Sequence, residues 1–354
     1  MNEWSLHRYL TKIQLDDFAN KFKSPVLKNC ISKIVPGEVN LYCALYSYGS
    51  RVANNAGLLK GGSKTLVKNL ENNYKNLGGK IHLNSEIKGF IFEGKKVVGI
   101  ETKNGDKFYA DYVISSLDPF NTLSLLPESC SCKFFTSKLH NKNYPIPSCL
   151  LASFSADKNE LEKLGLTFSY EFFIEPFIVG KTMQNSIKMH SFLYDSTFIN
   201  GDKTLVTVLL PQYATDYEYW NSFGSKAEYV NAKTEIGNKI KDEIVKHFPS
   251  LKDKIKLIDV CTEKTFERYV HSYKGAYQSY MWTSKGKLLT HNGKIKNAEN
   301  LVLGSQWSIT PGGLPPAMLS GKFAIQRILK KEHRKHKITK RLKYKFEFKE
   351  RKHD

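Results

Sequence analysis

The chain has 354 residues, 41% of them hydrophobic, and a formal net charge of +20 at pH 7. This length allows a substantial core and two domains, and the ordinary hydrophobic content is typical of a globular protein rather than a disordered one. No apolar run approaches the roughly 20 residues that span a bilayer, so the sequence predicts no transmembrane helix.

The first residues and the cysteines indicate a cytoplasmic protein. The N-terminal sequence MNEWSLHRYL lacks the charged and then apolar layout of a signal peptide. The cysteines contain no C-x-x-C pair, so we expect reduced thiols and no metal site among them. They are Cys30, Cys43, Cys130, Cys132, Cys149 and Cys261.

Residues 1–56 are expected to be helical. Leu6, Leu10 and Ile13 recur at helical spacing, and a cluster of apolar and aromatic residues over 39–48 indicates a buried helix. Pro36-Gly37 separates these helices. From the residues alone, this is a small helical region.

Residues 57–120 begin with a glycine loop and a helix. Gly61 and Gly62 precede the helix, Ser63 is its expected N-cap, and Gly78-Gly79 is expected to end it. The apolar residues that share one face of this helix are Leu66, Val67, Leu70, Tyr74 and Leu77.

Short strands follow this helix. They are predicted at 80–83, 87–92, 97–102 and 108–114. Asn104-Gly105 is the strongest hairpin signal in the chain. The segment is therefore predicted to form an antiparallel β-meander.

Residues 121–290 show a different pattern, in which strands surround one long helix. The strands are predicted at 149–155, 170–174, 188–194, 204–211 and 255–260, and the helix at 226–248. A short helix is expected over 262–269. This pattern predicts an α+β unit whose many Phe and Tyr side chains suit an apolar substrate chamber. The alternative is that most of these aromatic residues only build the core.

Residues 291–330 predict a strand, a tight turn and a helix. The strand at 301–303 stops at Gly304, and a turn rich in glycine and proline follows over 311–316. The helix after it starts with prolines, which suits an N-terminus. Its exposed N–H groups and positive dipole end favour a bound anion, although such a turn can also do no more than start a helix.

The sequence from Gly304 to Ala324 resembles the C-terminal flavin-binding segment of FAD-dependent oxidoreductases of the phytoene desaturase and carotenoid isomerase type. These enzymes are a branch of the amine oxidase-like flavoprotein superfamily. The resemblance implies FAD as the cofactor. The cofactor-binding residues that it implies here are Gly304, Gln306, Gly312, Gly313 and Leu314. Pro316 departs from the pattern, because the family has glycine there.

The same resemblance extends to two earlier segments. It implies that Gly61 and Gly62 lie beside the flavin ring, although Lys60 stands near the place of a family proline. It also implies that Glu86 and Ile87 contact the adenosine half of FAD, and that Tyr277 lies near the substrate. For each glycine taken alone, turn geometry is a sufficient explanation.

A dinucleotide-binding fold needs a G-x-G-x-x-G turn after its first strand, and this sequence has none. The resemblance thus covers the C-terminal two-thirds of such an enzyme. Three explanations are open: a truncated product, one half of a split protein completed by a separate N-terminal FAD-binding polypeptide, or a non-catalytic lipid- or membrane-surface-binding module.

The predicted fold is α/β: an incomplete FAD-binding Rossmann-like domain with an antiparallel β-meander, joined to an α+β substrate domain. In this division, 57–120 and 291–330 form the FAD-binding domain, 1–56 and 121–290 form the substrate domain, and 331–354 form a basic tail.

The resemblance implies hydride transfer from an extended apolar substrate, isoprenoid or carotenoid-like, to FAD, or double-bond isomerisation of that substrate. The backbone N–H groups of Gly312, Gly313 and Leu314 are then expected to stabilise negative charge on the reduced ring. The histidines are dispersed, so we predict no catalytic side chain and no metal.

The C-terminal residues carry much of the positive charge. Residues 330–354 hold 12 Lys/Arg against 4 Asp/Glu. A solvated helix end explains this charge, and peripheral contact with an anionic membrane is the first functional alternative. Nucleic acid ranks third, because no nucleic-acid-binding motif accompanies the charge.

Overall fold

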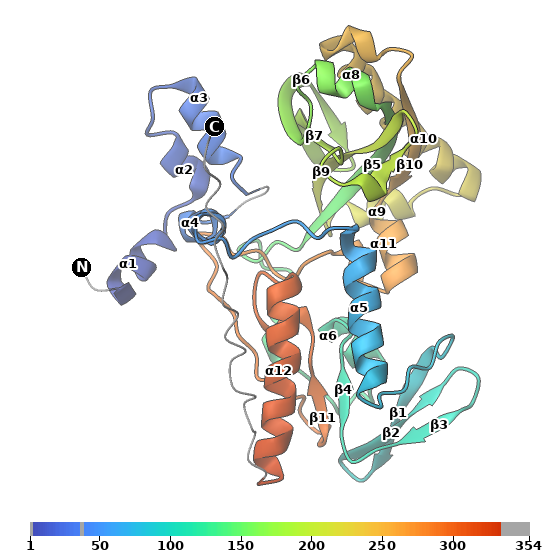
Figure 1. Ribbon diagram of the computed structural model, residues 1–354. Coiled ribbons are helices and arrows are strands. Elements are labelled where there is room, and N and C mark those ends of the chain that lie inside the picture. The colour runs from blue at the N-terminus through green and yellow to red at the C-terminus, as the bar shows by residue number, and fades with distance from the viewer. Residues whose placement is uncertain (1–2, 36–38, 334–354) are drawn as a thin grey trace.

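The computed structural model describes residues 3–35 and 39–333, and it has the mixed α/β architecture that the sequence predicts. Figure 1 shows a helical region beside the N-terminus, a large sheet region, and a third region built around two long helices. No helix within the described ranges is long and apolar enough to cross a membrane. The basic tail over 334–354 lies outside the described residues.

The N-terminal region is helical, as predicted. Its helices are α1 (Glu3–Leu10), α2 (Leu15–Ala19), α3 (Pro25–Ser32) and α4 (Leu41–Val52). The Asn40 side chain caps α4 by accepting a hydrogen bond from the Cys43 N–H at 2.9 Å. Leu15, Val39 and Ala44 pack with Met281, so these helices rest on a segment far along the chain.

The large sheet has six strands, all antiparallel to their neighbours. They are β5 (Pro147–Asp157), β6 (Ser169–Val179), β7 (Thr182–Ser191), β8 (Ile199–Asn200), β9 (Lys203–Tyr213) and β10 (Ile255–Cys261). The order is β10-β5-β9-β7-β6, and β8 pairs with β9. The five predicted strands of this region are therefore confirmed.

The predicted long helix is confirmed as α10 (Lys226–His247). It begins at a capping box, in which Ser225 and Glu228 each bond to the other's backbone N–H. A Cβ atom on Gly237 would lie 2.6 Å from a methyl group of Val260 on β10. The glycine therefore lets the helix pack closely on the sheet.

The smaller helices link these elements. They are α6 (Pro119–Ser124), α7 (Lys133–Thr136), α8 (Lys158–Lys163), α9 (Tyr217–Asn221), α11 (Glu263–Val270) and the 3-10 turns η1 (Ser196–Phe198), η2 (Pro249–Leu251), η3 (Tyr273–Gly275) and η4 (Gln306–Ser308). The predicted helix near 262–269 corresponds to α11.

The predicted meander forms from β1 (Ile87–Glu93), β2 (Lys96–Thr102) and β3 (Lys107–Tyr109). Asn104-Gly105 turns the chain as expected, with Gly105 at φ 89°. The single strand predicted over 108–114 is wrong. The chain leaves the meander after β3 and starts β4 (Val113–Ser115), which pairs in parallel with β11 (Leu301–Leu303).

The strand predicted at 80–83 is also wrong. No strand forms there, and Ile81 and Leu83 are 42% and 78% exposed. A strand needs a neighbour to bond its backbone groups, and no described strand pairs with this segment, although the His82 ring contacts Phe108 of β3.

Two long helices flank the β4–β11 pair: α5 (Gly62–Asn76) and α12 (Leu314–Lys331). Gly61, not the predicted Ser63, is the N-cap of α5, because the chain enters the helix in the left-handed conformation. Gly78-Gly79 ends α5 as predicted: their N–H groups bond to the Lys75 and Tyr74 carbonyls. In Figure 1 both helices begin at the end nearer the large sheet.

Candidate functional site

The turn before α12 is held against the Tyr277 segment by one side chain. The Gln306 Nε2 donates to the Tyr277 carbonyl at 3.3 Å, and the Gln306 Oε1 accepts from the Gly313 N–H at 2.6 Å. The Ser279 N–H also donates to the Pro311 carbonyl at 2.9 Å. The structure thus brings together Gln306, Gly313 and Tyr277, which the sequence predicted as parts of one site.

The conformation of this turn requires glycine. Gly312 and Gly313 have φ values of 92° and 94°. A Cβ atom on Gly312 would lie 2.9 Å from the Gln306 Oε1 and 2.9 Å from the Ser279 nitrogen. The bare backbone therefore packs directly against the Gln306 and Ser279 segments.

Only one of the three predicted backbone donors is available. The Gly312 N–H donates to the Ile309 carbonyl at 3.0 Å, and the Gly313 N–H is taken by Gln306. The expectation that both groups point at a ligand is thus wrong for this conformation. The Leu314 N–H has no acceptor among the described residues, and Leu314 is 61% exposed. Pro315 and Pro316 add no donor.

Gly304 has a packing role. A Cβ atom there would lie 2.7 Å from the Ile114 side chain and 3.7 Å from Ala324. The absence of a side chain lets β4, the end of β11 and α12 come together. This contact positions the turn, because the turn follows β11 and precedes α12.

Gly61 and Gly62 are held by the large sheet region. The Gly61 N–H donates to the Asp195 carboxylate at 2.6 Å, and a Cβ atom on Gly62 would lie 2.9 Å from the Phe198 ring. The N–H groups of Thr197 and Gly61 lower the pKa of Asp195. No described hydrogen bond joins this loop to the Gly312 turn, although α5 and α12 start at the same end of their region.

Glu86 and Ile87 lie at the other end of α5, where the meander begins. The Glu86 carboxylate pairs with Lys103 at 2.5 Å, and this contact lowers its pKa. The Glu86 carbonyl accepts from the Lys103 N–H at 2.8 Å, and Ile87 is in register with Thr102. These two residues are therefore separate from the Gln306–Tyr277 cluster.

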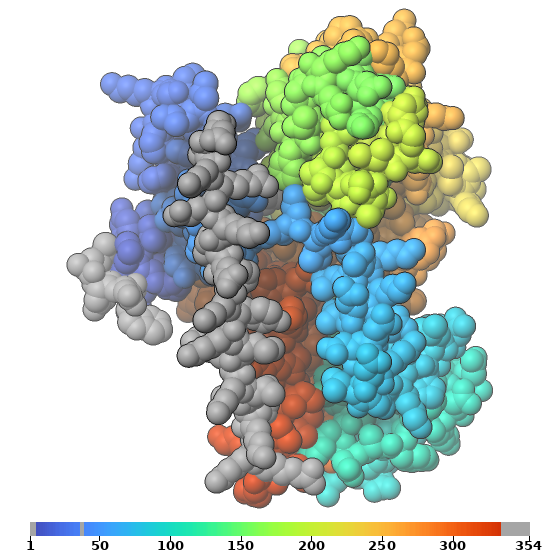
Figure 2. Space-filling model, viewed as in Figure 1, coloured from blue at the N-terminus to red at the C-terminus, as the bar shows by residue number. Residues whose placement is uncertain are grey.

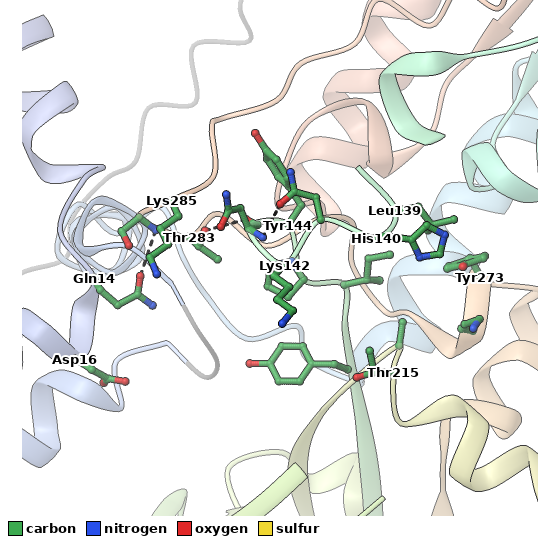
Figure 3. Close-up of a pocket in the computed structure, with 18 of the residues that line it drawn as sticks. Gln14, Asp16, Leu139, His140, Lys142, Tyr144, Thr215, Tyr273, Thr283 and Lys285 are labelled. Carbon is green, nitrogen blue, oxygen red and sulfur yellow. Dashed lines mark hydrogen bonds between the residues drawn. The ribbon is translucent and has the colours of Figure 1, made fainter. Parts of the chain in front are cut away.

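A cavity of about 960 Å³ lies elsewhere, and none of the predicted site residues lines it. Figure 3 shows side chains from α2, from the 139–146 segment and from 283–285 around it. The Thr283 hydroxyl donates to the Asn143 carbonyl at 2.9 Å, which ties two of its walls together. Its lining is mixed, with Asp16, Lys142 and Lys285 beside Leu139, Pro145 and Ile146.

Several aromatic residues of the large sheet region serve its core. Phe154, Phe172, Phe177 and Trp220 belong to one buried cluster with α10. The core-building alternative therefore holds for them. Tyr277 differs, because it is only half-buried beside the glycine turn and burial raises the pKa of its hydroxyl.

Sequence reasoning missed two buried polar residues near these elements. Glu263, in the first turn of α11, is fully buried, and neither carboxyl oxygen has a partner. Burial raises its pKa to about 8. The Ser279 hydroxyl beside Gly312 is likewise buried and unpartnered. No sequence signal distinguishes either residue, since acidic residues are common in exposed first turns and serines in loops.

The described residues contain no group of three His, Cys, Asp or Glu side chains that could hold a metal ion. Two side chains of types that can bind a metal do meet: the Cys132 sulfur lies 3.5 Å from the His291 Nε2. Burial raises the pKa of the Cys132 thiol and lowers that of His291 to about 4, so both are neutral near pH 7.

Several solved structures resemble parts of this chain. An oxidoreductase from Methanosarcina mazei is 15% identical with a TM-score of 0.49, over 77% of this chain and 55% of its own. The PF1083 protein from Pyrococcus furiosus is 16% identical with a TM-score of 0.42, over 72% and 53%. This chain thus spans about half the length of both.

Cyclohexylamine oxidase from Brevibacterium oxydans is 13% identical with a TM-score of 0.47, over 92% of this chain and 69% of its own. No curated protein matches the chain. Residues 32–329 match the model of the flavin containing amine oxidoreductase family, whose flavin agrees with the predicted FAD. The chain belongs to the flavin containing amine oxidoreductase family.

Proposed function

We propose that this chain is the substrate- and flavin-binding part of an FAD-dependent oxidoreductase of the phytoene desaturase type. Its reaction is hydride transfer from an extended apolar substrate, isoprenoid or carotenoid-like, or double-bond isomerisation of that substrate. The observation that supports this function best is the Gln306 bridge, which holds the Gly312-Gly313 turn and Tyr277 together at the start of α12.

The residues at the turn fit one side of a flat ring. Gly313 presents bare backbone, since a Cβ atom there would meet only the Gln278 Nε2, at 3.6 Å. The Leu314 N–H and the positive end of α12 would stabilise negative charge on a bound group. FAD, when bound, supplies the hydride acceptor. The protein's part is to orient the substrate against the turn, and Tyr277 is the side chain proposed for that role.

The substrate class rests on the sequence resemblance of Gly304 to Ala324. The cavity near Asp16 and Lys285 has a mixed lining and includes none of the predicted site residues, so we place the substrate on the Tyr277 side of the turn. There, a neutral tyrosine hydroxyl offers no charge that an apolar molecule would have to desolvate.

The test is flavin binding by the purified full chain, alone and together with the polypeptide encoded immediately upstream. Gln306→Ala removes both bridging hydrogen bonds, so we expect about tenfold weaker flavin binding, measured by titration of flavin fluorescence. Gln326→Ala, the same change within α12 and away from the turn, should stay within about twofold. Equal effects of both variants would contradict the proposal.

A non-catalytic membrane-surface module remains the second candidate. The observation that favours it is that the Gly312 and Gly313 N–H groups are already used within the turn. Saturable flavin binding together with turnover of an apolar polyene would exclude this candidate. Absence of flavin binding under all of these conditions, together with sedimentation with anionic vesicles, would favour it.

A further inference from the structure

Glu263 differs from other buried acidic residues that the structure describes. Asp118, Asp195 and Asp216 accept several hydrogen bonds, whereas neither carboxyl oxygen of Glu263 has a partner. Figure 1 places α11 beside the large sheet, next to the start of α5, and Figure 2 shows orange atoms of this part of the chain at the molecular surface. The end of the helix is open, with Tyr269 71% exposed, but Glu263 in its first turn is 0% exposed. A buried carboxyl without a partner is unfavourable when ionised, so it must carry a proton or move.

The surroundings of this carboxyl favour the proton. Burial, and then the negative charge of Asp216, raise the pKa of Glu263 to about 8. Asp216 is fixed in place, because its carboxylate accepts hydrogen bonds from the Lys181 and Tyr213 N–H groups at 2.5 and 2.9 Å. Among the described residues, no positive side chain lowers the pKa of Glu263. At pH 7 the carboxyl is therefore mostly protonated and neutral.

The other titratable groups near the first turn of α11 are neutral or paired. They are Cys149 on β5, Cys261 on β10, Tyr217 and Glu218 on α9, and Tyr273 and Lys274 on η3. Burial raises the pKa of both thiols and of both tyrosine hydroxyls. The Lys274 ammonium and the Glu218 carboxylate pair with each other at 2.7 Å. A proton lost from this cluster near pH 8 is therefore assigned to Glu263.

The backbone of Glu263 supports the segment that carries Tyr277. Gly275 has a φ of 67°, and a Cβ atom on it would lie 2.3 Å from the Glu263 carbonyl oxygen and 2.4 Å from the Glu263 Cα. The Ser148 hydroxyl donates to the Gly275 carbonyl at 2.9 Å. Two residues further on, the Tyr277 carbonyl accepts from Gln306. A chain of contacts thus leads from the buried carboxyl to the candidate site.

Ionisation would weaken this support. A Glu263 carboxylate would be buried beside Asp216 without a donor, so it needs water or a new partner. Because the Glu263 backbone touches Gly275, turning the side chain outward displaces the chain at Gly275. The Tyr277 carbonyl then moves away from the Gln306 Nε2, which is 3.3 Å from it in the described conformation.

We propose that Glu263 is a positioning residue for the candidate site. Its protonated carboxyl lets the first turn of α11 pack against Gly275 and so keeps Tyr277 at the glycine turn, and loss of the proton releases this segment. The inference rests on the proposed function and deepens it, because Tyr277 is the side chain proposed to orient the substrate. The carboxyl touches neither substrate nor flavin and acts through Gly275.

Amide hydrogen exchange of the full chain without flavin tests the release. The N–H groups of Gly275, Ala276 and Ser279 report on the segment, because each donates to a backbone carbonyl. The folded pKa of Glu263 lies above the ordinary 4.5, so the protection is greatest at low pH and is lost as the pH rises to about 8. Pulse labelling should show at least a tenfold fall in protection from pH 6 to pH 8, after correction for the exchange of unprotected amides. Constant corrected protection would overturn the proposal.

Three variants separate the carboxyl from the contact. Glu263→Gln removes the titrating group at nearly the same size, so protection should change by less than about twofold over this range. Glu235→Gln, the same change at an exposed position of α10, should keep the native profile. Ser148→Ala keeps the carboxyl but removes the bond to Gly275, so protection should fall about fivefold at every pH with the native slope. A native slope in Glu263→Gln, or a flat profile in Ser148→Ala, would overturn the proposal.

Flavin titration tests whether the segment serves the site. The affinity of the native chain should fall at least threefold from pH 7 to pH 9, because fewer chains hold the segment in the competent position, and Glu263→Gln should stay within about twofold. An equal fall in both would overturn the proposal. Exchange that depends on Glu263 without any flavin binding would sustain the positioning role and contradict the proposed function. Flavin binding with a flat exchange profile would sustain the function and overturn the positioning role.

Discussion

The large sheet and the β4–β11 pair differ in how far each satisfies its backbone hydrogen bonds and buries its apolar side chains. The core of the sheet region draws its buried residues from 150–260 and includes Phe154, Leu210 and Ile244, all fully buried. The β4–β11 pair has two strands of three residues each, and α5 beside it buries nothing. The first region satisfies its backbone and apolar groups with neighbours in sequence, whereas the second leaves both kinds of group open.

The difference follows from the type of sheet. Antiparallel strands are joined by short hairpins, so a contiguous stretch of chain can build a whole sheet. Parallel strands need crossovers, so β4 and β11 come from segments almost 190 residues apart and depend on other parts of a fold for their remaining neighbours. Local stability should therefore differ between the regions.

The largest expected effect is the loss of core packing in the large sheet. Phe154→Ala should lower the free energy of unfolding by about 3–5 kcal/mol, because Phe154 is fully buried. Leu70→Ala on the exposed side of α5 should lower it by less than about 0.5 kcal/mol. Urea denaturation measures both values. Comparable losses of unfolding free energy in the two variants would show that Leu70 is buried and that the two regions do not differ in packing.

Glu263 should make the stability of the sheet region depend on pH. Its folded pKa is raised from the ordinary value of 4.5 to about 8, so the folded state binds the proton more tightly than the unfolded state. The stabilisation of the folded state by this protonated carboxyl is fully present below pH 4.5. It is lost as pH rises toward 8, and the free energy of unfolding then falls by at most about 1.4 kcal/mol per pH unit. Glu263→Gln should flatten this dependence in denaturation at pH 5 and pH 8, and an unchanged slope would contradict it.

Substitution of Gly312 tests the conformation of the turn that precedes α12. Gly312→Ala should destabilise the chain by roughly 1–3 kcal/mol and weaken flavin binding, because the φ of 92° and the contact with Gln306 disfavour a Cβ atom. Gly321→Ala inside α12 meets no atom within 4 Å and should stabilise by about 0.5–1 kcal/mol. Thermal unfolding and flavin titration give the two readouts. If the two substitutions change the stability in the same direction, our interpretation of the turn is wrong.

The smallest effect is expected at the contact that fixes α5 to the sheet region. Asp195→Asn removes the carboxylate that accepts the Gly61 N–H, so hydrogen exchange at 61–66 should become faster while global unfolding changes little. Asp111→Asn, at an exposed position, is the control. If exchange at 61–66 stays the same, α5 has another anchor. The native Asp195 contact should weaken as pH falls through its lowered pKa.

Local patterns in the sequence predict the large sheet well. Apolar residues at strand and helix spacing mark β5, β9 and α10 within a few residues, because each element finds its partners nearby in the chain. The same kind of pattern fails at 80–83, where a strand-like segment has no described neighbour to bond. A strand's periodicity says which face is apolar, but it does not say whether another strand is present.

At the candidate site, sequence alone determined the glycine turn, the helix after it and the membership of the amine oxidase-like flavoproteins, but not the phytoene desaturase type. Only the tertiary structure decided that Gln306 joins this turn to Tyr277, that Gly61 is held by Asp195, and that Glu263 is buried. The physical reason is that backbone conformation and amphipathic spacing are encoded locally. Which donor meets which acceptor, and which carboxyl loses its water, depends on segments that are distant in the chain and meet only in the fold.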